Sequence, residues 1–482
     1  MKKKRLVSAA VIVSLLVPGV AAAQSQTTAG DSPQWLKDRQ YNEGVGIRTG
    51  DLELHPGVAV EGGYDSNFFL RSDKQGAANG PPGAPVIQAA TIRLAPSLYL
   101  STIGPQRREG DSGAQAPSIA FRAGVNALAR ALFGLSGNTA SENDVTKQDN
   151  IGLGAEAHLD ILPQRPFGFN VFGTYVRTVL PNVENANPDL SFNRDDVGVG
   201  GEFVLQPGGG TLDWRFGYQF HDTIFETDAA KAYANYTHQA YSRGRWRFRP
   251  RTSLVYDASL GFTTYTNTAA AETAGLVSSE PVRARIGLSG LLTDRFQALA
   301  LVGWGATFLD QTVTSAQPQY DSVIGQAELK WYVSASPGVA ATSDLGLALS
   351  SVAVGYTRDF STSYLGNYYG SDRGYLKFSY FFAGRALVTL EGGVAAVEYP
   401  NIYFSNAVQR SPAFTDKRVD ATLFGEYRFT DTLGLNATLR YTANFSDEDI
   451  NDAPQVAGAP PVGFINMAWS RFEAYLGVRW FM

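Results

Sequence analysis

Apolar residues stand at every second position over long stretches of this sequence. One row runs from Phe296 to Phe308, a second from Leu433 to Phe445 and a third from Ile151 to Ile161. A period of two places all members of a row on one face of a β-strand. Strands of globular domains average only about 5–6 residues, whereas a tilted strand needs roughly 9–11 residues to cross a lipid bilayer. The pattern therefore predicts membrane-crossing strands.

Composition excludes several other classes of protein. After residue 23 no uninterrupted apolar run approaches the length of a membrane-spanning helix, which needs about 20 residues. Aromatic residues make up 12% of the 482-residue chain, too many for a disordered protein. The chain has no cysteine, so that disulfides, thiolate metal sites and cysteine nucleophiles are impossible. Backbone polar groups are satisfied in lipid only by helices and closed barrels, which leaves a soluble protein or a barrel.

The first 23 residues are predicted to be a cleavable export signal. Basic residues 2–5 are followed by a mostly apolar stretch, residues 6–20, and by three alanines at 21–23. That order is typical of a secretory signal peptide. Cleavage after Ala23 would leave residues 24–55 as a short periplasmic segment before the first membrane-crossing strand.

The formal net charge of the chain is −5. The predicted signal carries four basic residues and no acid, so the exported part would carry −5 − 4 = −9. An acidic chain without a basic tail is not expected to bind nucleic acid.

We predict an all-β fold, a transmembrane antiparallel up-and-down β-barrel of about 18 strands (16–18) that spans residues 56–482. Long polar connections alternate with short ones, as outer loops alternate with periplasmic turns in such barrels. The long connections are predicted at 70–87, 133–147, 180–193, 223–237, 266–281, 310–320, 360–371, 400–416 and 446–464. Two connections on the short side, 102–117 and 335–344, are long as well. A missed strand there would change the count by two.

Aromatic residues gather near the ends of the predicted strands. Such residues form interfacial girdles in membrane barrels. The predicted girdle residues are Tyr175, Trp214, Tyr265, Trp331, Tyr399 and Trp480.

If the apolar rows face lipid, the residues between them face the lumen. Arginine at mid-depth on the lipid face would cost about 2–4 kcal/mol, so alternate arginines mark an inward face. The predicted lumen arginines are Arg215, Arg243, Arg245, Arg247, Arg249, Arg283 and Arg285. The predicted inward acids include Glu61, Asp65, Glu156, Asp160, Glu202, Asp213, Glu328, Glu391, Asp420, Glu426 and Glu473. The arginines either pair with these acids and hold the wall together, or line the pathway and attract anionic solutes.

No enzyme, metal site or cofactor is predicted. The four histidines have no metal-ligand spacing, and neither a GxSxG motif nor a phosphate-binding loop occurs. His221 next to Asp222 could belong to a Ser-His-acid site near the outer rim, although chance placement is the preferred interpretation. The acidic stretch 447–452 could bind a divalent ion, but a solvated loop is preferred.

Both ends of the predicted barrel resemble known outer-membrane proteins. Residues 56–69, Pro-Gly-Val-Ala-Val-Glu-Gly-Gly-Tyr-Asp-Ser-Asn-Phe-Phe, resemble the first strand of the β-barrel porin family. Similar proteins include the barrel exporters of secreted polysaccharides. The last residues, Tyr-Leu-Gly-Val-Arg-Trp-Phe-Met, resemble the C-terminal strand that the barrel assembly machinery recognises, although that strand usually ends in Phe or Trp.

The resemblance implies export of a polysaccharide across the outer membrane of a Gram-negative bacterium. Two alternatives remain open: a general or anion-selective diffusion porin, and a structural or adhesive surface barrel. The implied partners are outer-membrane lipid and lipopolysaccharide, the barrel assembly machinery and, for an exporter, periplasmic polysaccharide export proteins.

Overall fold

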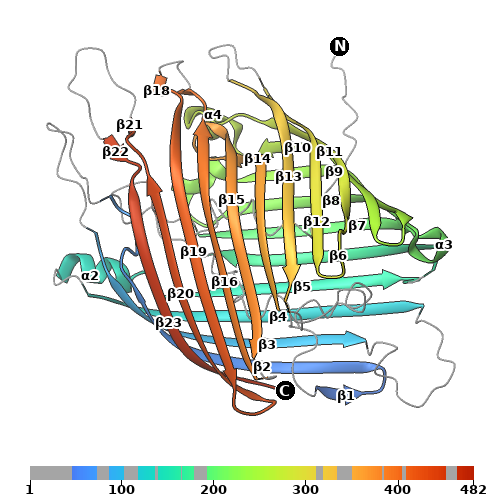
Figure 1. The fold of residues 1–482 in the computed structure, drawn as a ribbon. Coiled ribbons are helices and arrows are strands. Elements are labelled where there is room, and N and C mark those ends of the chain that lie inside the picture. The colour runs from blue at the N-terminus through green and yellow to red at the C-terminus, as the bar shows by residue number, and fades with distance from the viewer. Residues whose placement is uncertain are drawn as a thin grey trace.

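Eighteen antiparallel strands are hydrogen-bonded in a closed ring. The computed structural model describes residues 46–72, 86–102, 118–135, 139–163, 165–178, 193–310, 318–333, 350–382, 385–403, 409–451 and 464–482. The predicted signal peptide and residues 24–45 lie outside these ranges. In Figure 1 the orange and red strands of one wall cross steeply in front of the blue and green strands of the other wall, because the strands of a closed barrel are tilted.

The strands of the ring are long, as the sequence rows predict. They are β2 (Leu52–Asp65), β3 (Ala89–Thr102), β4 (Ile119–Gly134), β5 (Asn150–Ile161), β6 (Phe167–Thr178), β7 (Arg194–Leu205), β8 (Leu212–Phe225), β9 (Asn235–Arg249), β10 (Thr252–Tyr265), β11 (Ser279–Leu291), β12 (Phe296–Leu309), β13 (Tyr320–Tyr332), β14 (Ser351–Ser363), β15 (Asn367–Phe382), β16 (Ala386–Tyr399), β19 (Phe414–Arg428), β20 (Leu433–Phe445) and β23 (Trp469–Phe481).

The predicted fold class is confirmed, and the strand count is 18. β3 pairs directly with β4, and β13 with β14, so no further strand of the ring lies between them. The first strand of the ring begins at Leu52, four residues before the predicted start, and pairs there with the short β1 (Ile47–Thr49).

One predicted loop is wrong. The stretch 360–371 is mostly strand, and only Tyr364, Leu365 and Gly366 connect β14 to β15. Gly366 and Asn367 have φ angles of 77° and 67°, a left-handed conformation that glycine and asparagine adopt with little strain. The polar and tyrosine-rich sequence around this tight turn is typical of a loop, but most of its residues lie in the two paired strands.

The other connections carry small elements. They are α2 (Thr139–Thr146), α3 (Pro207–Gly210), η3 (Asp228–Tyr233), α4 (Thr268–Thr273), β17 (Ile402–Tyr403), β18 (Gln409–Ser411), β21 (Asp449–Asn451) and β22 (Phe464–Asn466). All but α3 lie at the end of the barrel with the long connections, which is the outer end in barrels of this kind. Within the described ranges no helix is long and apolar enough to cross a membrane.

The ring is closed by pairing of its first and last strands, β2 and β23, from Gly57 opposite Phe481 to Asp65 opposite Glu473. On the lumen side the ring of Tyr475 lies against the Cα of Gly63, where a Cβ would collide with it. A glycine is required at that point because the tyrosine occupies the space of a side chain.

The outer face of the barrel is apolar. Val302, Val394 and Leu476 are each about 60% exposed. Such exposure is expected of side chains that contact lipid rather than protein. Trp214, Trp331 and Trp480 are also exposed on this face near the ends of their strands, in the positions of an interfacial girdle.

Two predicted girdle residues are misplaced. Tyr265 and Tyr399 are only 3% and 4% exposed. Each shares the parity of an inward carboxylate on its strand, Asp257 and Glu391 respectively, so that it packs inside the outer mouth and not against lipid.

Part of the lumen is filled by apolar side chains. Ala59, Tyr99 and Leu128 on β2 to β4 form one buried cluster with Leu387 of β16 and Phe424 of β19. β4 and β16 are separated in the ring by five strands, so this cluster joins two parts of the wall across the inside of the barrel.

Candidate functional site in the barrel lumen

The strand register brings several of the predicted arginines together on one face of the wall. Arg215 of β8 lies opposite Arg243 of β9, which in turn lies opposite Asp257 of β10. Asp257 lies opposite Arg285 of β11. Trp246 and Phe248, between the arginines of β9, are 50% and 43% exposed on the outer face. Arg215, Arg243 and Arg285 therefore lie on the face opposite to these exposed aromatic residues.

Glu202 of β7 is the centre of the first ion-pair cluster. Its two carboxylate oxygens accept hydrogen bonds from Arg215 Nη1 at 3.0 Å and from Arg243 Nη2 at 2.8 Å. The Tyr241 hydroxyl also donates to it, at 2.6 Å. Arg215 is held further by Asp213, 2.9 Å away on the same strand. Because Glu202 is 5% exposed, removing its charge would leave two cations without their shared partner.

A second cluster reaches across the wall from β11 to β14. Arg285 binds Asp257 at 2.9 Å, and Arg283 binds Asp359 at 3.0 Å. Arg283 also donates to the backbone carbonyl of Phe360 at 2.5 Å. β12 and β13 lie between these strands in the ring, so the end of β14 must bend inward over them. Four of the seven predicted arginines thus hold the wall together.

The remaining three arginines differ from these four. Arg245, Arg247 and Arg249 are exposed, and within the described residues their guanidinium groups make no hydrogen bond or ion pair. Arg245 lies opposite Asp213 in register, but that carboxylate is bound by Arg215. The three arginines lie toward the short β9–β10 turn, which marks the periplasmic end. They form a group of solvent-exposed positive charges at the periplasmic end of β9, where a register shift against β10 interrupts the alternation after Trp246.

A third cluster, at the seam of the ring, was only partly predicted. Arg471 binds Asp65 at 2.9 Å and lies 3.3 Å from Glu473. Arg93 pairs with Glu61. The acids were assigned to the lumen from the sequence, but Arg471 and Arg93 were not. The alternation along each strand identifies both: Arg471 is two residues from the inward Glu473, and Arg93 is next to Leu94, which is exposed on the outer face.

The other inward charges are largely paired as well. Arg373 binds Asp420 at 2.6 Å, and Arg479 binds Glu426 at 2.6 Å. Glu328 accepts a hydrogen bond from Tyr375 at 2.7 Å. Both signs of charge therefore occur on the wall, but most carboxylates are engaged, and the group on β9 is not.

His221 and Asp222, which were considered as a catalytic pair, point to opposite faces of β8. His221 faces the lumen and lies 3.6 Å from Asp196 of β7, whereas Asp222 has the opposite parity on the same strand. Among the described residues no group of three or more His, Asp or Glu side chains could hold a metal ion. Of the acidic stretch 447–452, residue 452 lies outside the described residues, and Glu448 accepts a hydrogen bond from Ser411 at 3.0 Å.

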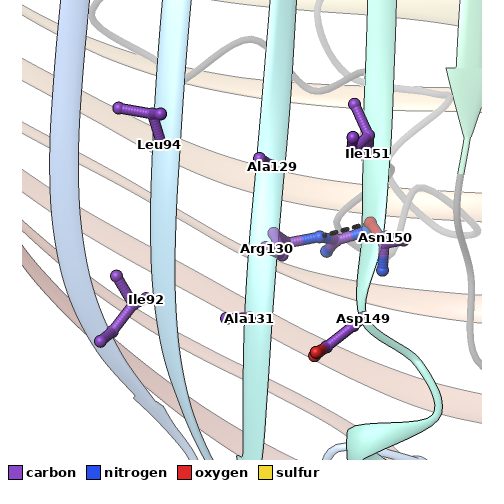
Figure 2. A pocket seen from close by; sticks show the side chains of 8 residues that line it. All are labelled: Ile92, Leu94, Ala129, Arg130, Ala131, Asp149, Asn150 and Ile151. Carbon is purple, nitrogen blue, oxygen red and sulfur yellow. Dashed lines mark hydrogen bonds between the residues drawn. The ribbon is translucent and has the colours of Figure 1, made fainter.

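A shallow groove of about 470 Å³ lies outside the lumen, on the lipid-facing surface. Ile92, Leu94 and Ile151 form its sides, and Ala129 and Ala131 of β4 form its floor (Figure 2). It exists because β4 presents small residues between larger ones on β3 and β5. Figure 2 also shows Arg130, which donates a hydrogen bond to the Asn150 side chain at 3.2 Å.

No protein-family model and no curated protein matches the chain. Solved structures similar to it include OpdL from Pseudomonas aeruginosa, with 10% identity, 90% of this chain and 99% of that chain covered and a TM-score of 0.43. OpdK from the same organism has 10% identity, 89% and 99% coverage and a TM-score of 0.40. The siderophore receptor PirA, also from that organism, has 9% identity, 89% and 80% coverage and a TM-score of 0.40.

The closed ring, the apolar outer face and the charged inner face define a transmembrane β-barrel of the outer-membrane type. Large exposed apolar side chains occur on most strands of the ring, and such a surface is stable in contact with lipid.

Proposed function

We propose that this barrel is a diffusion pore that favours small anionic solutes. Barrels of about 16–18 strands are wide enough to leave an aqueous channel. The observation that carries the preference for anions is the group of Arg245, Arg247 and Arg249, exposed and without a carboxylate partner among the described residues. A group of charges of one sign at the mouth of a pore raises the local concentration of ions of the opposite sign.

Of the functions predicted from the sequence, the alternative of an anion-selective diffusion porin is thus the one we adopt. Export of a polysaccharide and a role in adhesion stay predictions, because no contact among the described residues favours either.

The test is the reversal potential of the purified protein in a planar bilayer under a KCl gradient. We expect steady conductance with a preference for chloride, and we expect this preference to fall when Arg247 and Arg249 are both replaced by glutamine. Arg251→Gln is the matched control, because Arg251 lies in the β9–β10 turn and pairs there with Asp294 at 2.6 Å. Cation preference in the unchanged protein, or an equal effect of the control, would contradict the proposal.

A further inference from the structure

The tip of the β14–β15 hairpin lies across the outer mouth. The Tyr364 ring is 5.9 Å from that of Phe225, at the end of β8, and 5.3 Å from that of Tyr233 in η3. β8 and β14 are separated in the ring by five strands, β9 to β13. The hairpin therefore contacts a distant part of the rim and not only its neighbours.

The tip is held on both of its sides. Tyr364 packs against the buried residues Tyr265, Ala271 and Leu276, which belong to β10 and the α4 connection. The next residue, Leu365, is 6% exposed and belongs to another buried cluster, which includes Tyr399, Ile402 and Ile450 on the far side. Two apolar clusters thus meet at two consecutive residues of one turn.

Polar contacts fix the same position. The Asn367 side chain accepts a hydrogen bond from the backbone N–H of Val277 at 2.9 Å and donates one to the carbonyl of Gly275 at 3.1 Å. Both contacts join the hairpin to the connection that contains α4, and both are buried. Below them, Arg283 of β11 binds Asp359 on the lumen side, so that the hairpin is bound both to β11 and to the connection that precedes it.

We propose that the hairpin tip 364–366, with η3 and the α4 connection, is the size-selecting constriction of the pore. This inference rests on the proposed diffusion function and adds where the limit on solute size is set. Size is selected at the outer mouth, by apolar and tyrosine side chains, whereas charge is selected at the periplasmic mouth, by the arginines of β9.

The experiment compares two variants that weaken the contacts of the hairpin tip with the unchanged protein. Tyr364→Ala removes the ring that contacts Phe225 and Tyr233. Asn367→Gly removes both side-chain hydrogen bonds but keeps a residue that tolerates the positive φ. Single-channel conductance and the uptake of neutral sugars of increasing size into proteoliposomes are measured. Folding of each variant is verified by the heat-dependent shift of its band on a denaturing gel. We expect a severalfold rise in conductance and a larger size limit in both variants, with the chloride preference unchanged.

Two controls separate the possible outcomes. Tyr441→Ala removes a tyrosine that is 38% exposed on the outer face and should leave both measurements unchanged. Phe424→Ala opens the apolar cluster in the periplasmic half of the lumen. Wild-type values in both folded tip variants, or enlargement by Phe424→Ala alone, would overturn the inference while the anion-selective pore stands. Absence of conductance from every folded protein would contradict the proposed function as well.

Discussion

Arg471 in the last strand of the barrel donates a hydrogen bond to Asp65 in the first strand, across 406 positions of sequence. Both side chains are less than 10% exposed, and Glu473 lies 3.3 Å from the same guanidinium group. The contact joins the two strands whose pairing closes the ring.

Replacing Arg471 with alanine should therefore weaken the closure. Removal of one partner of a buried pair typically costs about 3–5 kcal/mol, and here it leaves Asp65 and Glu473 close together without a cation. We expect the folded band on a denaturing gel to be lost at a clearly lower temperature.

Arg251→Ala breaks an ion pair with Asp294 in which both side chains are more than half exposed, a kind of pair worth only about 0–1 kcal/mol. Equal transition temperatures for Arg471→Ala and Arg251→Ala would show that the buried pair Arg471–Asp65 contributes no more to stability than an exposed pair.

Two adjacent glycines of β2 should respond differently to alanine. A Cβ at Gly63 would collide with the ring of Tyr475, whereas a Cβ at Gly62 meets nothing within 4 Å. We expect Gly63→Ala to lower the free energy of unfolding by about 1–3 kcal/mol, the usual cost of overpacking, and Gly62→Ala to leave it nearly unchanged. Urea unfolding in detergent, followed by tryptophan fluorescence, measures both. Rescue of Gly63→Ala by Tyr475→Ala would confirm the collision, and no difference between the two glycines would refute it.

Glu202→Gln should increase the preference for anions. The substitution removes one negative charge from the lumen and releases Arg215 and Arg243 from their shared carboxylate. The reversal potential under a KCl gradient should therefore move toward that of chloride. Glu328→Gln removes the same charge from a site bound by Tyr375 and controls for charge alone. A shift no larger than that of the control would show that the released arginines do not reach the pathway.

Arginine in the middle of the lipid face should be costly. Val302 is 59% exposed near the centre of β12, where a charged residue typically costs about 2–4 kcal/mol. We expect Val302→Arg to be destabilised by that amount in equilibrium unfolding from lipid vesicles, and Val302→Leu to behave like the unchanged protein. Tolerance of the arginine would mean that this face does not meet the hydrocarbon core.

Much of the barrel could be predicted because its physical cause is local. Alternation assigns each residue to lipid or lumen without knowledge of its neighbours, so the inward side of Glu202 and Arg243 follows from β7 and β9 separately. Their hydrogen bond does not follow, because it depends on the register between three strands. The pairing of Arg283 with Asp359 was still harder to predict from the sequence, since it requires β14 to bend over two intervening strands.

The errors have a common physical origin at the outer mouth. Tyr265 and Tyr399 were predicted to lie at the membrane interface because aromatic residues at strand ends often do so. Here they pack against elements of the outer connections, whose positions are set by contacts between residues distant in sequence. For the same reason the sequence around the turn after Ser363 predicts a long loop, although the Asn367 side chain makes two buried hydrogen bonds there.

The pairing of β2 with β23 has a consequence for biogenesis. Until the final strand is in place, a growing barrel has two unsatisfied edges, each able to pair with another chain. Pairing of β2 with β23 removes both edges in one step. A barrel in which β2 and β23 are not yet paired is therefore an open sheet, which can act as a template for aggregation.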